Sequence, residues 1–307
     1  MTVASAFERD SVGASAPPRP AKRKLSPWER QSRNLTWSLL SLPLVAMAVL
    51  FVAPLLVLLY ISFGGWASSF NLAGYERLAV PVYWRLLWFT LQMAVTVTFA
   101  CAVLAYPIAY LIVCFKGRFA QLMALGLFVS LWMSFLARTF AWIVILQRNG
   151  IANSFMMNIG IIDEPLSLVY NTTGVYIGMI HIMLPFMIVT LVPTMSAIDD
   201  AYLRAGLSLG GRPFQVFRQV FFPLSMPGVV AGSILVFALS FGMYITPAIL
   251  GGGRAPTIVL AVRDQISKMG DLQLAAATSM VLLAICLGIL IFYNWIVGVD
   301  RILERDK

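Results

Sequence analysis

Six long apolar runs, none of which holds an acidic residue, constrain this sequence more than any other feature. They cover residues 35–63, 86–115, 119–146, 174–197, 227–250 and 272–299. About 20 apolar residues are enough for a helix to cross the roughly 30 Å hydrocarbon core of a bilayer. A helix also satisfies its own backbone hydrogen bonds, which lipid cannot do. The runs therefore predict an all-α integral membrane protein with six transmembrane helices.

The composition excludes an ordinary soluble domain. Apolar residues make up 60% and charged residues 11% of the chain, and the mean hydropathy is +0.86, whereas soluble domains average about 25% charged residues. The first run is too long for the apolar core of a cleaved signal peptide, so it is predicted to stay as an anchor. Cys101, Cys114 and Cys286 lack any ligand spacing, which predicts neither a disulfide framework nor a metal site.

The distribution of basic residues predicts the orientation of the chain. Fifteen lysines and arginines lie in the tails and loops on the side of the N-terminus, against six on the other side. Basic residues near span ends are retained in the cytoplasm, so both termini are predicted to be cytoplasmic. Residues 1–34 form a basic tail, expected to be mostly disordered up to about Ser26 and to lie against anionic lipid rather than nucleic acid. The membrane domain is predicted to cover residues 35–299, followed by a cytoplasmic tail at 300–307.

Arg138 and His181 are the only basic residues within the predicted spans, so they are the ones that could carry a positive charge there. Carriers driven by protons or sodium usually keep a carboxylate at membrane depth, and none is present here. Counted along a straight helix, Arg138 lies about 27 Å from the inner end, so we expect it to snorkel at the outer interface. For His181 we expect a neutral side chain bonded to a neighbouring helix, with a proton relay as the alternative.

One long polar insertion, Ile198 to Gly228, separates the fourth and fifth runs; we call it the central segment. Residues 201–209 predict a short helix, which Gly210 and Gly211 end. Pro213 suits the first turn of a second helix running to Phe222. Pro223 and Pro227 are then expected to end that helix before the fifth run. The central segment is thus predicted to be a compact pair of helices on the cytoplasmic side.

The central segment resembles the "EAA" loop of ABC-importer permeases, whose pattern is Glu-Ala-Ala, three residues, Gly, and later an apolar residue before Pro. Residues 204–210 read RAGLSLG, and residues 222–228 read FPLSMPG. The resemblance implies a coupling helix that docks on an ATPase subunit. The residues of this ATPase-docking loop are Arg204, Ala205, Gly206, Gly210, Phe217 and Pro223. The family's glutamate is replaced by Arg204 and its second alanine by Gly206, so the acidic contact is not carried over.

Three further stretches resemble the spermidine/putrescine type of these permeases. They read AYPIAY at 105–110, LWMSFLARTFAW at 131–142 and LSFGMYITPAILGG at 239–252. The resemblance implies a bacterial inner-membrane permease that pairs with a second related permease, two ATPase subunits and a periplasmic binding protein. The implied solute is a polyamine such as spermidine or putrescine. Opines, phosphonates, 4-aminobutyrate and ferric iron are the alternatives within the same class.

Aromatic side chains in the spans are candidates for the translocation path, because rings attract ammonium groups by cation–π interaction. The aromatic candidates are Tyr106, Tyr110, Trp132, Phe135, Trp142, Phe241 and Tyr244, and Thr246 is added because it lies beside Tyr244 in the fifth span. Each ring can instead serve in packing or in an interfacial belt. Gly242, Thr246 and Pro247 are expected to loosen the fifth span beside Tyr244.

No catalytic, cofactor or metal site is predicted. The sequence has no GxxxxGK[ST] phosphate loop, so ATP hydrolysis is assigned to a separate subunit. An ion-coupled secondary transporter and a membrane scaffold are the alternatives from other classes. The missing intramembrane acids argue against the first, and the structured central segment argues against the second. The sequence therefore predicts a translocation subunit that is not an enzyme.

Overall fold

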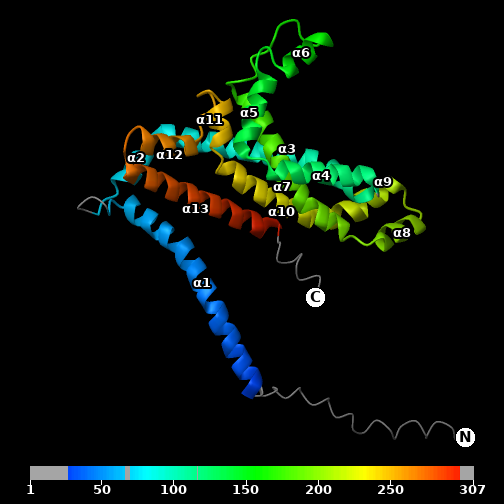
Figure 1. The fold of residues 1–307 in the computed structure, drawn as a ribbon, viewed down its shortest axis with the longest axis horizontal. Coiled ribbons are helices and arrows are strands. Elements are labelled where there is room, and N and C mark those ends of the chain that lie inside the picture. The colour runs from blue at the N-terminus through cyan, green and yellow to red at the C-terminus, as the bar shows by residue number, and fades with distance from the viewer. Residues whose placement is uncertain (1–26, 66–69, 116, 298–307) are drawn as a thin grey trace, which may run out of the picture. The chain divides into compact units, whose positions relative to one another are not determined.

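The computed structural model describes residues 27–65, 70–115 and 117–297, and this part of the chain contains helices and no strands. The helices are α1 (Pro27–Ser62), α2 (Ala73–Leu78), α3 (Pro81–Cys114), α4 (Arg118–Trp132), α5 (Phe135–Leu146), α6 (Ile151–Asn158), α7 (Thr172–Ser196), α8 (Asp200–Ser208), α9 (Pro213–Val216), a π-helix (Phe217–Phe221), α10 (Phe222–Phe241), α11 (Ile245–Leu250), α12 (Ile258–Ser267) and α13 (Leu272–Val297) (Figure 1). Of the tail predicted at 1–34, residues 27–34 form the start of α1, while residues 1–26 and the tail predicted at 300–307 lie outside the described residues.

The chain divides into two compact units, residues 1–57 and residues 58–307. The first contains most of α1. From Pro43 to Ser62 this helix is long and apolar enough to cross a membrane. Its apolar side chains, including Leu44, Met47 and Leu50, are exposed, as expected of a helix that faces lipid.

Five described helices could each span a membrane, or six if a bent pair counts as one span. The bent pair is α4 with the chain from Phe135 to Asn158, and the chain bends by 106° at the break between them. The prediction of one straight helix over 119–146 is therefore wrong. The chain breaks because Met133 and Ser134 adopt extended backbone angles, with ψ of 137° and 139°. The predicted fifth span is also divided, since α10 ends at Phe241 and α11 begins at Ile245.

The core of the second unit is formed where α3, α7 and α10 pack against one another. Residues 93, 97, 101, 105 and 109 of α3 are fully buried and follow one another at intervals of four, so they form one face of that helix. Three of them, Cys101, Ala105 and Ala109, are small. Small residues at an interface let membrane helices approach closely, which explains how α3 fits tightly against α7.

The ends of this bundle carry different elements. Helices α8 and α9 lie together at one end, and α2 and α12 lie at the opposite end (Figure 1). There α2 and α12 pack on α13, and an ion pair between Arg77 and Asp271 joins α2 to the start of α13. The central segment therefore forms one end of the bundle. It is connected directly to α7, and through the π-helix to α10.

Candidate coupling surface and translocation path

The central segment begins with the predicted short helix, α8, and a glycine turn then leads into a second helix that starts with α9. Asp199 caps α8, its carboxylate accepting a 2.8 Å hydrogen bond from the Ala201 N–H. Gly210 has a φ of +85°, a left-handed conformation that glycine adopts without strain. The N–H of Gly211 then donates to the Gly206 carbonyl at 3.1 Å. These bonds fix the chain direction between α8 and α9.

Apolar side chains on the central segment are exposed in spite of its polar sequence. Their exposed fractions are 60% for Tyr202, 48% for Leu207, 88% for Leu209 and 72% for Phe214. Arg204 is exposed on α8 as well. Exposed large apolar groups gathered on one structured element are typical of a surface that another protein covers.

The helix that follows Pro213 does not end at Pro223 or Pro227, so that prediction is wrong. It continues through the π-helix into α10, which runs on to Phe241. Pro223 lies directly after the π-helix, as the second residue of α10. In the π-helix the N–H of Phe222 reaches the carbonyl of Phe217, five residues back. π-Helical turns of this kind are frequent at functional sites.

Tyr106 and Tyr110 lie beside the central segment, away from the other path candidates. The Tyr110 ring packs edge-on against Phe217 and Phe221, with centroids 5.3 and 5.2 Å apart. The Tyr106 hydroxyl is 2.8 Å from the Ser225 hydroxyl at the start of α10. Tyr106, Tyr110 and Phe217 border a cavity of about 450 Å³. These two tyrosines therefore connect α3 to the π-helix.

Arg138 is buried in the middle of the bundle, which corrects the expectation that it snorkels at an interface. Only 3% of the residue is exposed. Its Nη1 donates to the Ile182 carbonyl at 3.3 Å and its Nη2 to the Met133 carbonyl at 3.2 Å. Ile182 lies ten residues into α7, about 15 Å along a helix of about 37 Å. The straight-helix count failed because the chain bends before Arg138.

Helices α5, α7 and α11 bring several of the other candidates together. The Trp142 indole N–H donates to Nδ1 of His181 at 3.1 Å, so His181 is bonded to a neighbouring helix as predicted. Phe135 stacks on Phe186 with centroids 6.1 Å apart. Thr246, which is fully buried, lies 3.4 Å from the Thr139 hydroxyl.

Three candidates from the sequence are placed differently from this group. Tyr244 is 45% exposed in the break between α10 and α11. Trp132 is 79% exposed at the end of α4. Phe241 is buried in a separate cluster with Ala94 and Phe237, against which α13 packs. The sequence signal, an aromatic ring in an apolar run, could not separate these environments.

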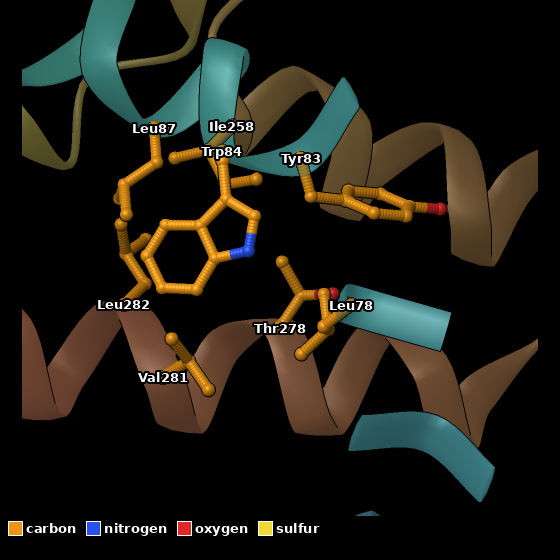
Figure 2. Close-up of a pocket in the computed structure, with 8 residues that line it drawn as sticks. All are labelled: Leu78, Tyr83, Trp84, Leu87, Ile258, Thr278, Val281 and Leu282. Carbon is orange, nitrogen blue, oxygen red and sulfur yellow. The ribbon is translucent and has the colours of Figure 1, made fainter. Parts of the chain in front are cut away.

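A pocket between α3 and α13 is too small to be a solute site. Figure 2 shows the Trp84 indole lying over Val281 and Leu282 of α13, with Ile258 behind it. The pocket has about 30 Å³ of free space, and its lining is almost entirely apolar. That volume holds about one water molecule, so a polyamine does not fit.

Known proteins that resemble this chain are transport permeases. The chain is 32% identical to the spermidine/putrescine transport system permease protein PotB of Escherichia coli (strain K12) over 226 residues, which are 74% of this chain and 82% of PotB. It is 30% identical to the inner membrane ABC transporter permease protein YdcU of the same organism, over 87% of this chain and 91% of YdcU. This chain belongs to the permease family of ABC importers.

The solved structures agree with this family at the level of the fold. A bacterial ABC transporter involved in the import of the acidic polysaccharide alginate superposes with a TM-score of 0.71 at 12% identity, over 90% of this chain and 98% of that chain. The MetNI methionine ABC transporter gives 0.52 at 14% identity, over 75% and 99%. No family model matches the chain. The permease is thus a multi-pass inner-membrane subunit that is itself non-catalytic, as the sequence predicted.

Proposed function

We propose that this permease forms half of the membrane pathway of an ABC importer for a polyamine such as spermidine or putrescine. A second related permease completes the pathway, two ATPase subunits drive it, and a periplasmic binding protein delivers the solute. The observation that carries the solute class is the 32% identity to PotB over 82% of that protein. A relative named as a 2-aminoethylphosphonate permease, PhnU of Salmonella typhimurium, is 24% identical, so a phosphonate is the second candidate.

The central segment is proposed as the surface that docks on the ATPase. It exposes apolar side chains on α8 and α9, and it lies at one end of the bundle (Figure 1). It is also covalently continuous with two core helices, α7 and α10, so a force applied to it reaches the core directly. The proposed docking residues are those of the EAA-like pattern, namely Arg204, Ala205, Gly206, Gly210, Phe217 and Pro223.

The solute path is proposed to follow the side of the bundle formed by α5, α7 and α11. Trp142 and Phe135 are half-buried there, and Tyr244 exposes its ring beside α11. Each ring can hold an ammonium group by about 0.5 to 2 kcal/mol. The predicted spans contain no carboxylate, and several weak contacts let a polycation move on where a carboxylate cage would retain it.

Uptake by the reconstituted importer tests the solute. Proteoliposomes that hold the permease, its partners and loaded binding protein should accumulate labelled spermidine or putrescine when ATP is supplied. Tyr244→Ala should slow uptake at low solute concentration by about 2-fold to 30-fold, because it removes one cation–π contact. Phe292→Ala, an exposed ring on α13, is the control and should transport normally. Uptake of a phosphonate with polyamines ignored would refute the polyamine assignment.

The orientation is proposed from the charge bias, with the central segment in the cytoplasm. Asp163 and Arg212 are both exposed, one in the connection after α6 and the other before α9. With the three natural cysteines replaced, Asp163→Cys should react with an impermeant maleimide in cells whose outer membrane has been permeabilised. Arg212→Cys should react only after the inner membrane is opened as well. The opposite labelling pattern would mean that the chain is inserted the other way round.

A further inference from the structure

Arg138 occupies an unusual position for a charged side chain in a membrane protein. It is almost fully buried at mid-depth in the bundle. The ion pairs found among the described residues are Arg77 with Asp271, and Arg263 and Lys268 with Asp264. None of them includes Arg138, although an arginine at this depth is costly unless it is paired. Its guanidinium must therefore be held by neutral groups.

Those neutral groups belong to two different segments of the chain. One terminal nitrogen bonds to the Ile182 carbonyl of α7, and the other bonds to the Met133 carbonyl at the break between α4 and α5. The guanidinium carbon lies 5.0 Å from the centre of the Phe135 ring. Phe135 in turn stacks on Phe186 of α7, with the ring planes 16° apart. These contacts link the break to α7 or stabilise that link, while Nε of Arg138 is buried without a hydrogen-bond partner among the described residues.

The regular backbone hydrogen bonding is interrupted near both segments. The last carbonyls of α4 have no helical N–H partners beyond the break, and Arg138 supplies a donor to one residue in it. On α7, Pro185 lacks the N–H that would bond the His181 carbonyl four residues back, so the Ile182 carbonyl lies in a turn that has lost one helical hydrogen bond. A planar guanidinium can reach two carbonyls at once, whereas an ammonium is a single point.

We propose that Arg138 is a positioning residue whose guanidinium ties the break between α4 and α5 to α7. Helix α5 packs on α11, so this tie makes the α5 and α11 side of the path follow α7. Helix α7 ends at Ser196, and Ala197 connects it directly to the central segment, which begins at Ile198. This inference rests on the proposed coupling function, because it assigns to Arg138 the transfer of α7 movement to the path.

Cross-linking tests the tie without using any solute. In a chain whose natural cysteines are replaced, Trp142→Cys and His181→Cys place one thiol on α5 and one on α7. These substitutions also remove the Trp142 to His181 hydrogen bond, so that, among the described residues, the bond from Arg138 to Ile182 remains as the polar link found between α5 and α7. With Arg138 present, a short bifunctional maleimide should join the thiols efficiently in the assembled complex. Arg138→Met should lower the yield by about fivefold and Arg138→Lys by about half, because lysine reaches one carbonyl rather than two.

Transport coupling provides the second measurement. In the otherwise natural complex, Arg138→Met should keep the stimulation of ATP hydrolysis by loaded binding protein, while uptake per ATP falls about tenfold. Arg138→Lys should recover part of that loss. The matched control is Phe140→Ala, which truncates an exposed ring on the same helix two residues away and should match the natural complex in both measurements.

The outcomes separate this inference from the proposed function. An equal cross-linking yield with methionine and arginine, or an unchanged uptake per ATP, would overturn the positioning role. If the methionine variant fails to accumulate, the lysine variant decides: wild-type values in both measurements overturn the role. If the natural complex hydrolyses ATP but does not import polyamines, the solute assignment fails, and the cross-linking result still decides whether Arg138 ties the helices.

Discussion

Gly210→Val should uncouple ATP hydrolysis from solute uptake in an importer that still assembles. The φ of Gly210 is +85°, and no atom lies within 4 Å of the position that a Cβ would take. The cost of a side chain is therefore strain in the backbone rather than a clash. Left-handed geometry costs about 1–2 kcal/mol for an ordinary residue, and valine, which is β-branched, fits it poorly. The turn is expected to relax and change the angle between α8 and α9.

The relaxed turn should misplace the docking surface. If the docking free energy that is lost is comparable with this strain, uptake per ATP should fall about tenfold. Gly160→Val is the matched control, because Gly160 has a φ of +72° and equally open surroundings in the connection after α6. It carries a similar backbone strain at a site remote from the central segment in sequence and should leave coupling intact. Normal coupling with Gly210→Val would show that the central segment does not transmit the work of the ATPase.

Gly232→Ile should destabilise the permease more than a substitution at any lipid-facing glycine. A Cβ at Gly232 of α10 would overlap the Thr190 hydroxyl and the Met187 sulfur of α7. Those two helices form part of the core, so they would have to separate to admit the side chain. Overpacking of this kind typically costs about 1–3 kcal/mol. The thermal unfolding midpoint in detergent should fall by several degrees.

The control for this stability prediction is Gly288→Ile on α13. No atom lies within 4 Å of a Cβ at Gly288, and isoleucine has a higher helix propensity than glycine. Its unfolding midpoint should therefore be unchanged or slightly raised. Equal midpoints for the two variants would mean that the close contact between α7 and α10 does not contribute to stability.

Local sequence signals predicted the elements that depend on local physics. Long apolar runs located the helices that could span the membrane, because lipid requires such runs. The short helix expected over 201–209 is found at Asp200–Ser208. Asp199 and Gly210 mark its two ends by capping and by backbone freedom, and both act within a few residues.

The break in the third span had no such signal. Residues 127–149 contain neither proline nor glycine, which are the usual causes of a sharp kink. The extended geometry at Met133 is instead accompanied by the Arg138 bond to Ile182, a residue 44 positions further along the chain. The pairing of Tyr106 with Ser225 spans 119 positions. Contacts over such separations depend on the tertiary fold, so neither a periodicity nor a spacing could predict them.

The continuous helical path from Pro213 to Phe241 gives the permease a lever arm. Twenty-nine residues in this path extend over about 43 Å at the helical rise, so a tilt of about 5° at one end displaces the other by about 4 Å. Pro223 and Pro227, the two prolines that were expected to end the helix, lie in the middle part of this path, and the helix continues past both of them to Phe241. If the central segment docks on the ATPase as proposed, a small rotation of it would displace the far end of α10, which Tyr244 follows, by more than the size of a methyl group.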